Sequence, residues 1–174
     1  MFWLTIVRDF IKLLRAGQDP RQIAGGFALG SILGLSPMLT LQGVAVWLII
    51  LILNVNISAA LLAITLCALF AYIFDPLFHM LGYALLVNVD ALHGLWTWLY
   101  NAPIAPLTRF NNTVVMGSFV VALVVFTPIY VGMQKFVVAY RTHVGEKIEK
   151  WKIYQIISKS SLVKLYQRIR DLKG

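Results

Sequence analysis

Two ionisable side chains, Asp75 and His79, stand one helical turn apart in an otherwise apolar stretch. A spacing of four residues places both on the same face of a helix. A carboxylate beside an imidazole can relay a proton, and an ionisable group in apolar surroundings is costly enough to indicate a function. The alternative is structural: Asp75 precedes Pro76, so its carboxylate could cap a helix that starts again at the proline.

The remaining sequence carries no catalytic motif. A phosphate-binding Gly-Lys loop, H-E-x-x-H and G-x-S-x-G are all absent, and Cys67 is the only cysteine. A metal site built from Asp75, His79 and His93 is conceivable, but nothing in the segment that joins them constrains its geometry. The sequence therefore predicts a protein that is not an enzyme and that carries no cofactor and no metal.

Charge is distributed very unevenly along the chain. Residues 22–134 contain three charged side chains, whereas ten of the fifteen Lys and Arg residues follow Gln134. With 60% hydrophobic residues and a mean hydropathy of +0.80, this pattern predicts an all-α integral membrane protein. We therefore expect the basic ends to set the orientation of the protein in the membrane and to attract lipid headgroups. Nucleic-acid binding is not expected, since no nucleic-acid reading motif accompanies these residues.

The first apolar segment predicts a broken hairpin. Asp19 and Pro20 are typical of a helix start, and the apolar run over residues 22–54 is interrupted at Pro37. Each arm would have about 15 to 17 residues, or roughly 22 to 26 Å, which is short for a hydrocarbon core of about 30 Å. We therefore expect a hairpin whose arms are re-entrant.

Two transmembrane helices are expected to follow, over residues 57–87 and 113–134, with a break or kink at Pro76 in the first. Between them, residues 88–112 mix Trp and Tyr with prolines and predict an interfacial loop. Because basic residues flank both ends, both termini are expected in the cytoplasm. Pro37 and the loop at 88–112 then lie toward the opposite side.

Amphipathic interfacial helices are predicted at both ends of this membrane domain. The expected division is an N-terminal helix over 1–18, the membrane domain over 19–140 and a basic tail over 141–174. The tail combines an apolar stripe with cations, which suits an anionic lipid surface, although a protein docking site is the alternative. The cations expected to meet lipid headgroups are Lys147, Lys150, Lys152, Lys159, Lys164, Arg168 and Arg170.

Three glycines recur every fourth residue before Pro37: Gly26, Gly30 and Gly34. On a helix they leave one face without side-chain bulk, so that another backbone can approach closely. Packing within the chain is one interpretation. A seam for an oligomer or partner, or a lipid-contacting groove, is the other.

Polar residues gather around Pro37 and in the later helix. Irregular backbone at membrane depth is tolerated where it lines a cavity, so these side chains could form a polar cavity together. Alternatively, the hydroxyl groups next to Pro37 only satisfy carbonyls that the proline releases. The candidate cavity residues are Ser36, Thr40, Gln42, Asp75 and His79.

The segment from Pro20 to Pro37 resembles the signature P-x-x-I-A-x-G-x-A-x-G-x-x-x-G-x-x-P of the bacterial membrane family called domain of unknown function 2062. The resemblance extends to about Arg141 and departs at Asp75, where the family has Asn before a proline. It implies the membrane fold and, as a class of partner, large envelope-spanning lipid-transfer proteins. Further matching positions are Gln42, Asn56, Ala59, Ala60 and Pro76.

These features lead to three functional hypotheses. The first is a non-enzymatic, multi-pass subunit or dock in the bacterial inner membrane that serves envelope lipid transport, contacts membrane phospholipids and works with a large periplasm-spanning lipid-transfer protein. The second is a proton- or ion-coupled transporter subunit that uses Asp75 and His79. A lipid-modifying enzyme comes third, because the sequence lacks an acid/base or nucleophile set.

Overall fold

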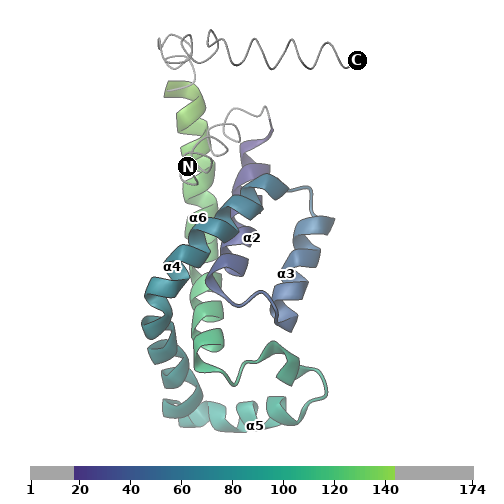
Figure 1. Cartoon of the computed structure of the whole chain (residues 1–174), viewed down its shortest axis with the longest axis vertical. Helices are drawn as coiled ribbons and strands as arrows, with labels where there is room; N and C mark the ends of the chain where they lie inside the picture. Colours follow the sequence, from purple (N-terminus) through teal and green to yellow (C-terminus); the bar gives the residue numbers. More distant parts are fainter. Residues whose placement is uncertain (1–17, 144–174) are drawn as a thin grey trace, which may run out of the picture. The chain divides into compact units, whose positions relative to one another are not determined.

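The computed structural model describes residues 18–143, which are helical apart from short connections and contain no strand (Figure 1). The all-helical fold is thus confirmed. The packing discussed below belongs to the compact unit that ends at Val137. In chain order the helices are α2 (Pro20–Leu35), α3 (Leu41–Ile52), α4 (Ile57–Tyr83), the π-helix η1 (Ala84–Asn88), the 3-10 helix η2 (Asp90–Leu92), α5 (His93–Asn101), the 3-10 helix η3 (Ala105–Thr108) and α6 (Thr113–His143).

The hairpin of α2 and α3 begins and turns where the sequence predicts. The side chain of Asp19 accepts a hydrogen bond from the N–H of Arg21 at 2.8 Å, and Pro20 occupies the first helical position. The turn around Pro37 separates the two helices, and Thr40 caps α3 by accepting from the N–H of Gly43 at 3.3 Å. With 16 and 12 residues, α2 and α3 are about 24 and 18 Å long.

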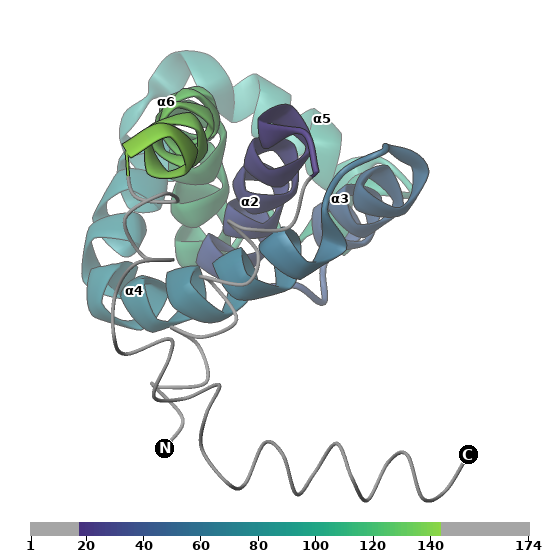
Figure 2. The same cartoon turned by 90° about the horizontal axis from the view of Figure 1, so that it is seen from above.

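Helix α2 is the central element of the core. Figure 2 shows it between α3, α4 and α6, and ten of its sixteen residues are buried. A helix that is buried on nearly all sides has no polar face to present to solvent. The main apolar cluster draws on all four helices and consists of Leu29, Ile32, Leu33, Val46, Ile50, Ala60, Ile64 and Ala122.

Helix α4 continues through Pro76 without ending, although Figure 1 shows that it changes direction along its length. A proline inside a helix removes one backbone hydrogen bond and bends the helix, so a kink, and not a break, is the outcome here. The helix ends in the wider turn of η1.

Two sequence-based boundaries are wrong. Residues 88–112 were expected to form a loop, yet they contain α5, because Pro103 and Pro106 come after that helix and do not interrupt it. Figure 1 shows α5 lying across the ends of α4 and α6. The last helix was expected to stop at Gln134 but runs to His143, through the predicted domain boundary at residue 140. Its charged residues end the apolar stretch without disfavouring a helix.

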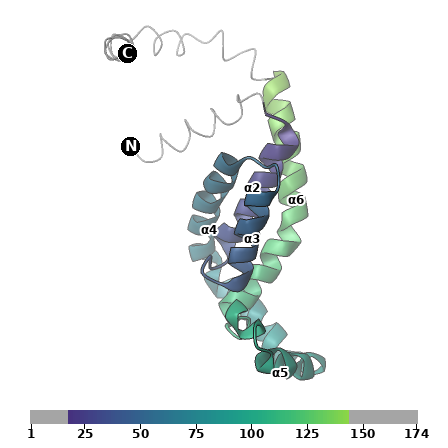
Figure 3. The ribbon, with the colours of Figure 1, turned by 90° about the vertical axis from the view of Figure 1, so that its right-hand side faces the viewer.

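Two helical segments, Ile57–Asn88 and Thr113–Thr142, are long and apolar enough to cross a membrane, whereas α3 is apolar but shorter. In the most apolar stretch of each long segment, only 17% and 22% of the residues are buried inside the structure. In the view of Figure 3, α4 and α6 flank α2 and α3. The interfacial helices predicted for 1–18 and 141–174, and the tail cations from Lys147 to Arg170, lie outside the described residues except for residues 18 and 141–143.

Candidate functional site

The glycine stripe of α2 lies against α4. A Cβ added to Gly26 would stand 2.2 Å from the carbonyl oxygen of Asn56, and one added to Gly30 would stand 2.3 Å from that of Ala60. At Gly34 the added atom would meet the Cβ of Cys67 at 2.6 Å. The two helices therefore run parallel at a backbone distance that only glycine allows, and α4 covers the stripe within the same chain.

Asn56 ties the starts of α2 and α4 together. Its side-chain oxygen accepts from the N–H of Ala59 at 2.7 Å and caps α4, while its amide nitrogen donates to the side chain of Gln18. Its backbone N–H also donates to the carbonyl of Gln22 at 3.0 Å. In the sequence, only the family resemblance singled out Asn56, because an Asn before a helix is otherwise an ordinary helix cap.

A second close approach joins α4 and α6 and was missed by the sequence analysis. A Cβ on Gly82 would lie 1.8 Å from the carbonyl oxygen of Thr113, and one on Gly117 would lie 1.9 Å from that of Phe78. These helices are antiparallel at this point. Single glycines in separate helices form no stripe, so no pattern in the sequence indicates that Gly82 and Gly117 face each other.

The hydroxyl groups near Pro37 serve the local backbone. Ser36 donates to the carbonyl of Ile32 at 2.7 Å, and Thr40 donates to the carbonyl of Pro37 at 2.9 Å. Both side chains are buried. Their position agrees with the structural alternative, in which they satisfy carbonyls at the end of α2 and in the turn.

Asp75 and His79 do not bond to each other. Nδ1 of His79 lies 2.6 Å from Oγ1 of Thr113, so its partner is on α6. Asp75 is half-buried, and its carboxylate makes no hydrogen bond or ion pair with another residue of the described segment 18–143. Because Asp75 stands within α4, the prediction that it caps a helix after Pro76 is wrong.

A metal site does not form from these residues. His93 bonds to the carbonyl of Val87 through Nε2 at 3.1 Å, and His79 is engaged with Thr113. Within residues 18–143, no three His, Cys, Asp or Glu side chains come close enough to hold a metal ion.

Gln42 is the one predicted cavity residue that lines a described cavity. This cavity has a volume of about 260 Å³ and an almost wholly apolar lining, and Gln42 contributes from the start of α3. Its Oε1 is buried and accepts no hydrogen bond from the part of the chain that the structure describes. The other lining residues come from α5, η3, α6 and the turn before α6, and are Trp96, Leu99, Ala105, Thr108, Phe110, Val115, Met116 and Phe119.

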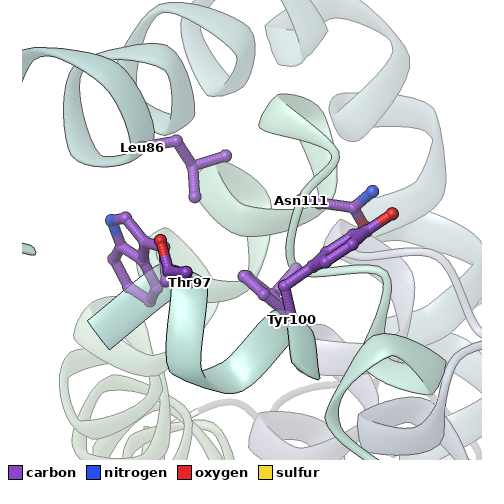
Figure 4. Close-up of a pocket in the computed structure, with 6 residues that line it drawn as sticks. Leu86, Thr97, Tyr100 and Asn111 are labelled. Atoms are coloured by element: carbon purple, nitrogen blue, oxygen red, sulfur yellow. The ribbon is translucent and has the colours of Figure 1, made fainter. Parts of the chain in front are cut away.

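A second cavity, of about 320 Å³, adjoins the first and is shown in Figure 4. Leu86 reaches it from η1, Thr97 and Tyr100 from α5, and Asn111 from the turn before α6. Trp96 and Phe110 line both cavities, with ring centroids 5.9 Å apart. Polar and apolar groups are mixed here, unlike in the first cavity. The sequence analysis placed the aromatic residues at an interface but could not assemble these cavities.

The comparisons with known proteins agree with the resemblance in the sequence. The profile of a bacterial family, described as "Uncharacterized protein conserved in bacteria (DUF2062)", matches residues 5–144. An "Uncharacterized protein" of Treponema pallidum (strain Nichols) is 28% identical over 156 residues, which cover 90% of this chain and 96% of that protein. No solved structure matches the chain significantly. Since the profile covers most of its length, the chain belongs to the bacterial family DUF2062.

Proposed function

We propose that this chain is a multi-pass protein of the bacterial inner membrane, with both termini in the cytoplasm. The supporting observation is the outward surface of α3, α4 and α6, which consists of large apolar side chains. Ile52 on α3, Ile73 on α4 and Val124 on α6 are 81%, 69% and 70% exposed. Such a surface is unfavourable in water and suits lipid tails.

The positions of the charges support this placement. Asp19, Arg21 and Lys135 gather at one end of the unit, where the starts of α2 and α4 lie near the later part of α6. Asp90 and Arg109 lie at the opposite end, next to α5. The stretch of α6 from Thr113 to Gln134 is about 32 Å long, close to the thickness of a hydrocarbon core of about 30 Å.

The hairpin of α2 and α3 is then re-entrant. Both helices are shorter than a membrane span, and their turn ends on the side of η3, which contacts α3. The segment of α5 and η3 thus lies beyond the hairpin tip at the far interface. Trp98 and Tyr100 of α5 are 67% and 61% exposed, as expected for aromatic residues at headgroup depth.

Within that membrane the chain serves, we propose, as a non-enzymatic subunit in envelope lipid transport. The single observation that carries this function is the apolar cavity between the hairpin tip and α5. The proposed topology would put this cavity at the depth where lipid tails meet headgroups. The partner is a large periplasm-spanning lipid-transfer protein, a class suggested by the family resemblance. In this arrangement α5 and η3 face the periplasm and meet that partner.

Lipid delivery in cells tests the function. In a bacterium that encodes this chain, a pulse of labelled glycerol should reach outer-membrane phospholipids more slowly after deletion of the gene. The parent chain and its Gly132→Ala variant should both restore the rate, since Gly132 has open space around it. An unchanged rate of lipid delivery in the deletion strain would overturn the lipid-transport role.

The partner is tested separately. Cross-linking in intact cells from photoreactive residues at Trp98 and Leu107, which are exposed on α5 and η3, should capture one large envelope protein. The same group at Leu48 of α3, which faces lipid in this arrangement, should not. Equal capture from both surfaces would show that α5 and η3 are not the docking region.

A proton- or ion-coupled subunit is the second candidate, and one observation favours it. The Asp75 carboxylate is half-buried in an apolar helix without a partner in the described chain. Because His79 is engaged with Thr113, the carboxylate of Asp75 has no second titratable group bonded to it within residues 18–143. Flux through reconstituted vesicles that depends on pH and is abolished in Asp75→Asn would place this candidate first.

A further inference from the structure

The two cavities next to α5 differ in chemistry and share one wall. The wall is the Trp96 and Phe110 pair, and Trp96 is held in place because its Nε1 donates to the carbonyl of Leu85 at 3.1 Å. On one side the lining is apolar except for Gln42 and Thr108, and the hydroxyl of Thr108 donates to the carbonyl of Ala105. On the other side Thr97, Tyr100 and Asn111 offer hydroxyl and amide groups. An apolar space and a space of mixed polar and apolar lining, divided by a fixed aromatic wall, suit a ligand with an apolar part and a polar part.

A cation is adjacent to this wall in the chain, without lining either cavity. Arg109 lies between Thr108, which lines the apolar cavity, and Phe110, which lines both. It is exposed, and its guanidinium has no hydrogen bond or ion pair with the rest of residues 18–143. Arg109 is also the only basic residue between Arg21 and Lys135 in the sequence. Its backbone is left-handed, with φ of 55°, a conformation that side chains other than glycine adopt uncommonly.

The order of these groups along the start of α6 matches the order of groups in a lipid. Arg109 and Asn111 precede the helix, Val115 and Met116 lie in its first turn, and Phe119 is one turn further toward the hairpin. A headgroup would therefore be at the α5 end and a tail would point into the bilayer. The guanidinium suits a phosphate, which it can bind through two parallel N–H groups.

We propose that the α5 end of this protein binds one anionic phospholipid taken from the surrounding bilayer. One acyl chain occupies the apolar cavity, the glycerol region lies against Thr97, Tyr100 and Asn111, and the phosphate pairs with Arg109. The side chain of Gln42 bonds to no other residue of 18–143, and its NH₂ group donates to an ester carbonyl at the head of the tail. This inference rests on the proposed lipid-transport function and names its substrate class.

A photoreactive lipid tests the site in the full-length protein. The chain is reconstituted in phosphatidylcholine nanodiscs that contain a small fraction of phosphatidylglycerol with a diazirine in one acyl chain, and labelled residues are mapped by mass spectrometry. Labelling should concentrate on Leu99, Met116 and Phe119. Bulk lipid contact is reported by Leu48 and Val124, which are 53% and 70% exposed on α3 and α6.

Variants separate the headgroup from the tail. Arg109→Gln should lower labelling of Met116 by about tenfold, because a charge-assisted hydrogen bond is lost, and Arg109→Lys should retain most of it. Arg21→Gln, at the opposite end of the unit, is the matched control and should change nothing. Ala105→Phe should fill the apolar cavity and remove labelling of Met116, whereas Gly94→Phe, which has open space around it on α5, should not.

Three results would overturn the site. In the first, Met116 is labelled no more strongly than Leu48. In the second, neither Arg109→Gln nor Ala105→Phe changes the labelling. In the third, Met116 is cross-linked to a co-purified polypeptide in place of lipid. Arg109 is exposed, so its variants test the site even if Ala105→Phe does not fold. Absence of specific labelling at the site, together with slower lipid delivery in the deletion strain, would refute this inference alone. An intact site with no delivery defect in the deletion strain would refute the proposed function alone.

Discussion

At the scale of single residues, the polar side chains next to helix ends and turns bond to the backbone. Ser36 and Thr40 bond to carbonyls around the Pro37 turn, and Asn56 caps α4. In apolar surroundings an unpaired backbone group is costly. A polar side chain beside a helix end therefore has the structural role of bonding to that group. The side chains of Gln42, Asp75 and Arg109 have no such partner within residues 18–143, and they carry the functional arguments.

Asn56 is expected to contribute measurably to stability. Asn56→Ala removes the cap on α4 and the bond to Gln18, and should lower the free energy of unfolding by about 1 to 3 kcal/mol. Asn54→Ala, at an exposed position two residues earlier, is the control and should have little effect. Equilibrium unfolding of both variants in mixed micelles measures the difference. Equal stability would show that the Asn56 bonds are replaced by lipid or water.

Asp75 is expected to contribute little to folding. Because its carboxylate has no partner in the described chain and caps no helix, Asp75→Asn and Asp75→Leu should both melt at or above the temperature of the parent chain. Thermal unfolding in detergent makes the comparison. If Asp75→Leu alone melts much lower, the carboxylate has a polar partner that must be replaced. Stable variants that fail to complement a deletion would instead assign Asp75 a functional role.

At the scale of elements, glycines set how closely the helices approach. The stripe on α2 brings α4 into backbone contact, and Gly82 with Gly117 does the same for α4 and α6. Because apolar side chains gain little from leaving lipid for protein, tight backbone packing is a main source of helix association in membranes. Helix α4 therefore depends on two glycine contacts, one with each neighbour.

Gly30→Ala is expected to destabilise the fold severely. The added Cβ would stand 2.3 Å from the carbonyl oxygen and 2.7 Å from the Cα of Ala60, and backbone atoms cannot move aside. A loss of about 1 to 3 kcal/mol or more is expected for such overpacking. Gly132→Ala on α6 meets nothing within 4 Å and is the matched control. Melting temperatures in detergent should separate the two, and an unchanged Gly30→Ala protein would mean that α2 and α4 are not in contact.

At the scale of the whole molecule, the charges at the two ends predict its orientation. In a Cys67→Ser background, a thiol reagent confined to the periplasmic side should modify a cysteine placed at Asp90 but not one placed at Arg21 or Lys159. Labelling of all sites after permeabilisation is the control for reactivity. The reverse pattern would place both termini outside and would contradict the proposed topology.

Much of the fold was predictable because it depends on local properties of the chain. The helix starts at Asp19 and Pro20, the turn at Pro37 and the two long apolar helices follow from capping, proline geometry and hydropathy. α5 was missed because its Trp and Tyr residues were interpreted as a sign of an interfacial position, which does not specify the backbone conformation. Its helical state depends on the absence of proline between His93 and Asn101. The extension of α6 was missed because the end of the helix was predicted from the charged residues that end the apolar stretch, and charged residues do not end a helix.

The sequence by itself determined that this chain is helical, apolar and basic at its ends, since composition and spacing are properties of the chain alone. It also placed small residues along one face of α2. Only the tertiary structure decided which surface that face meets, that His79 turns to Thr113 and not to Asp75, and that Trp96 and Phe110 divide two cavities. These are contacts between residues far apart in the chain, and a spacing rule describes only neighbours on one helix.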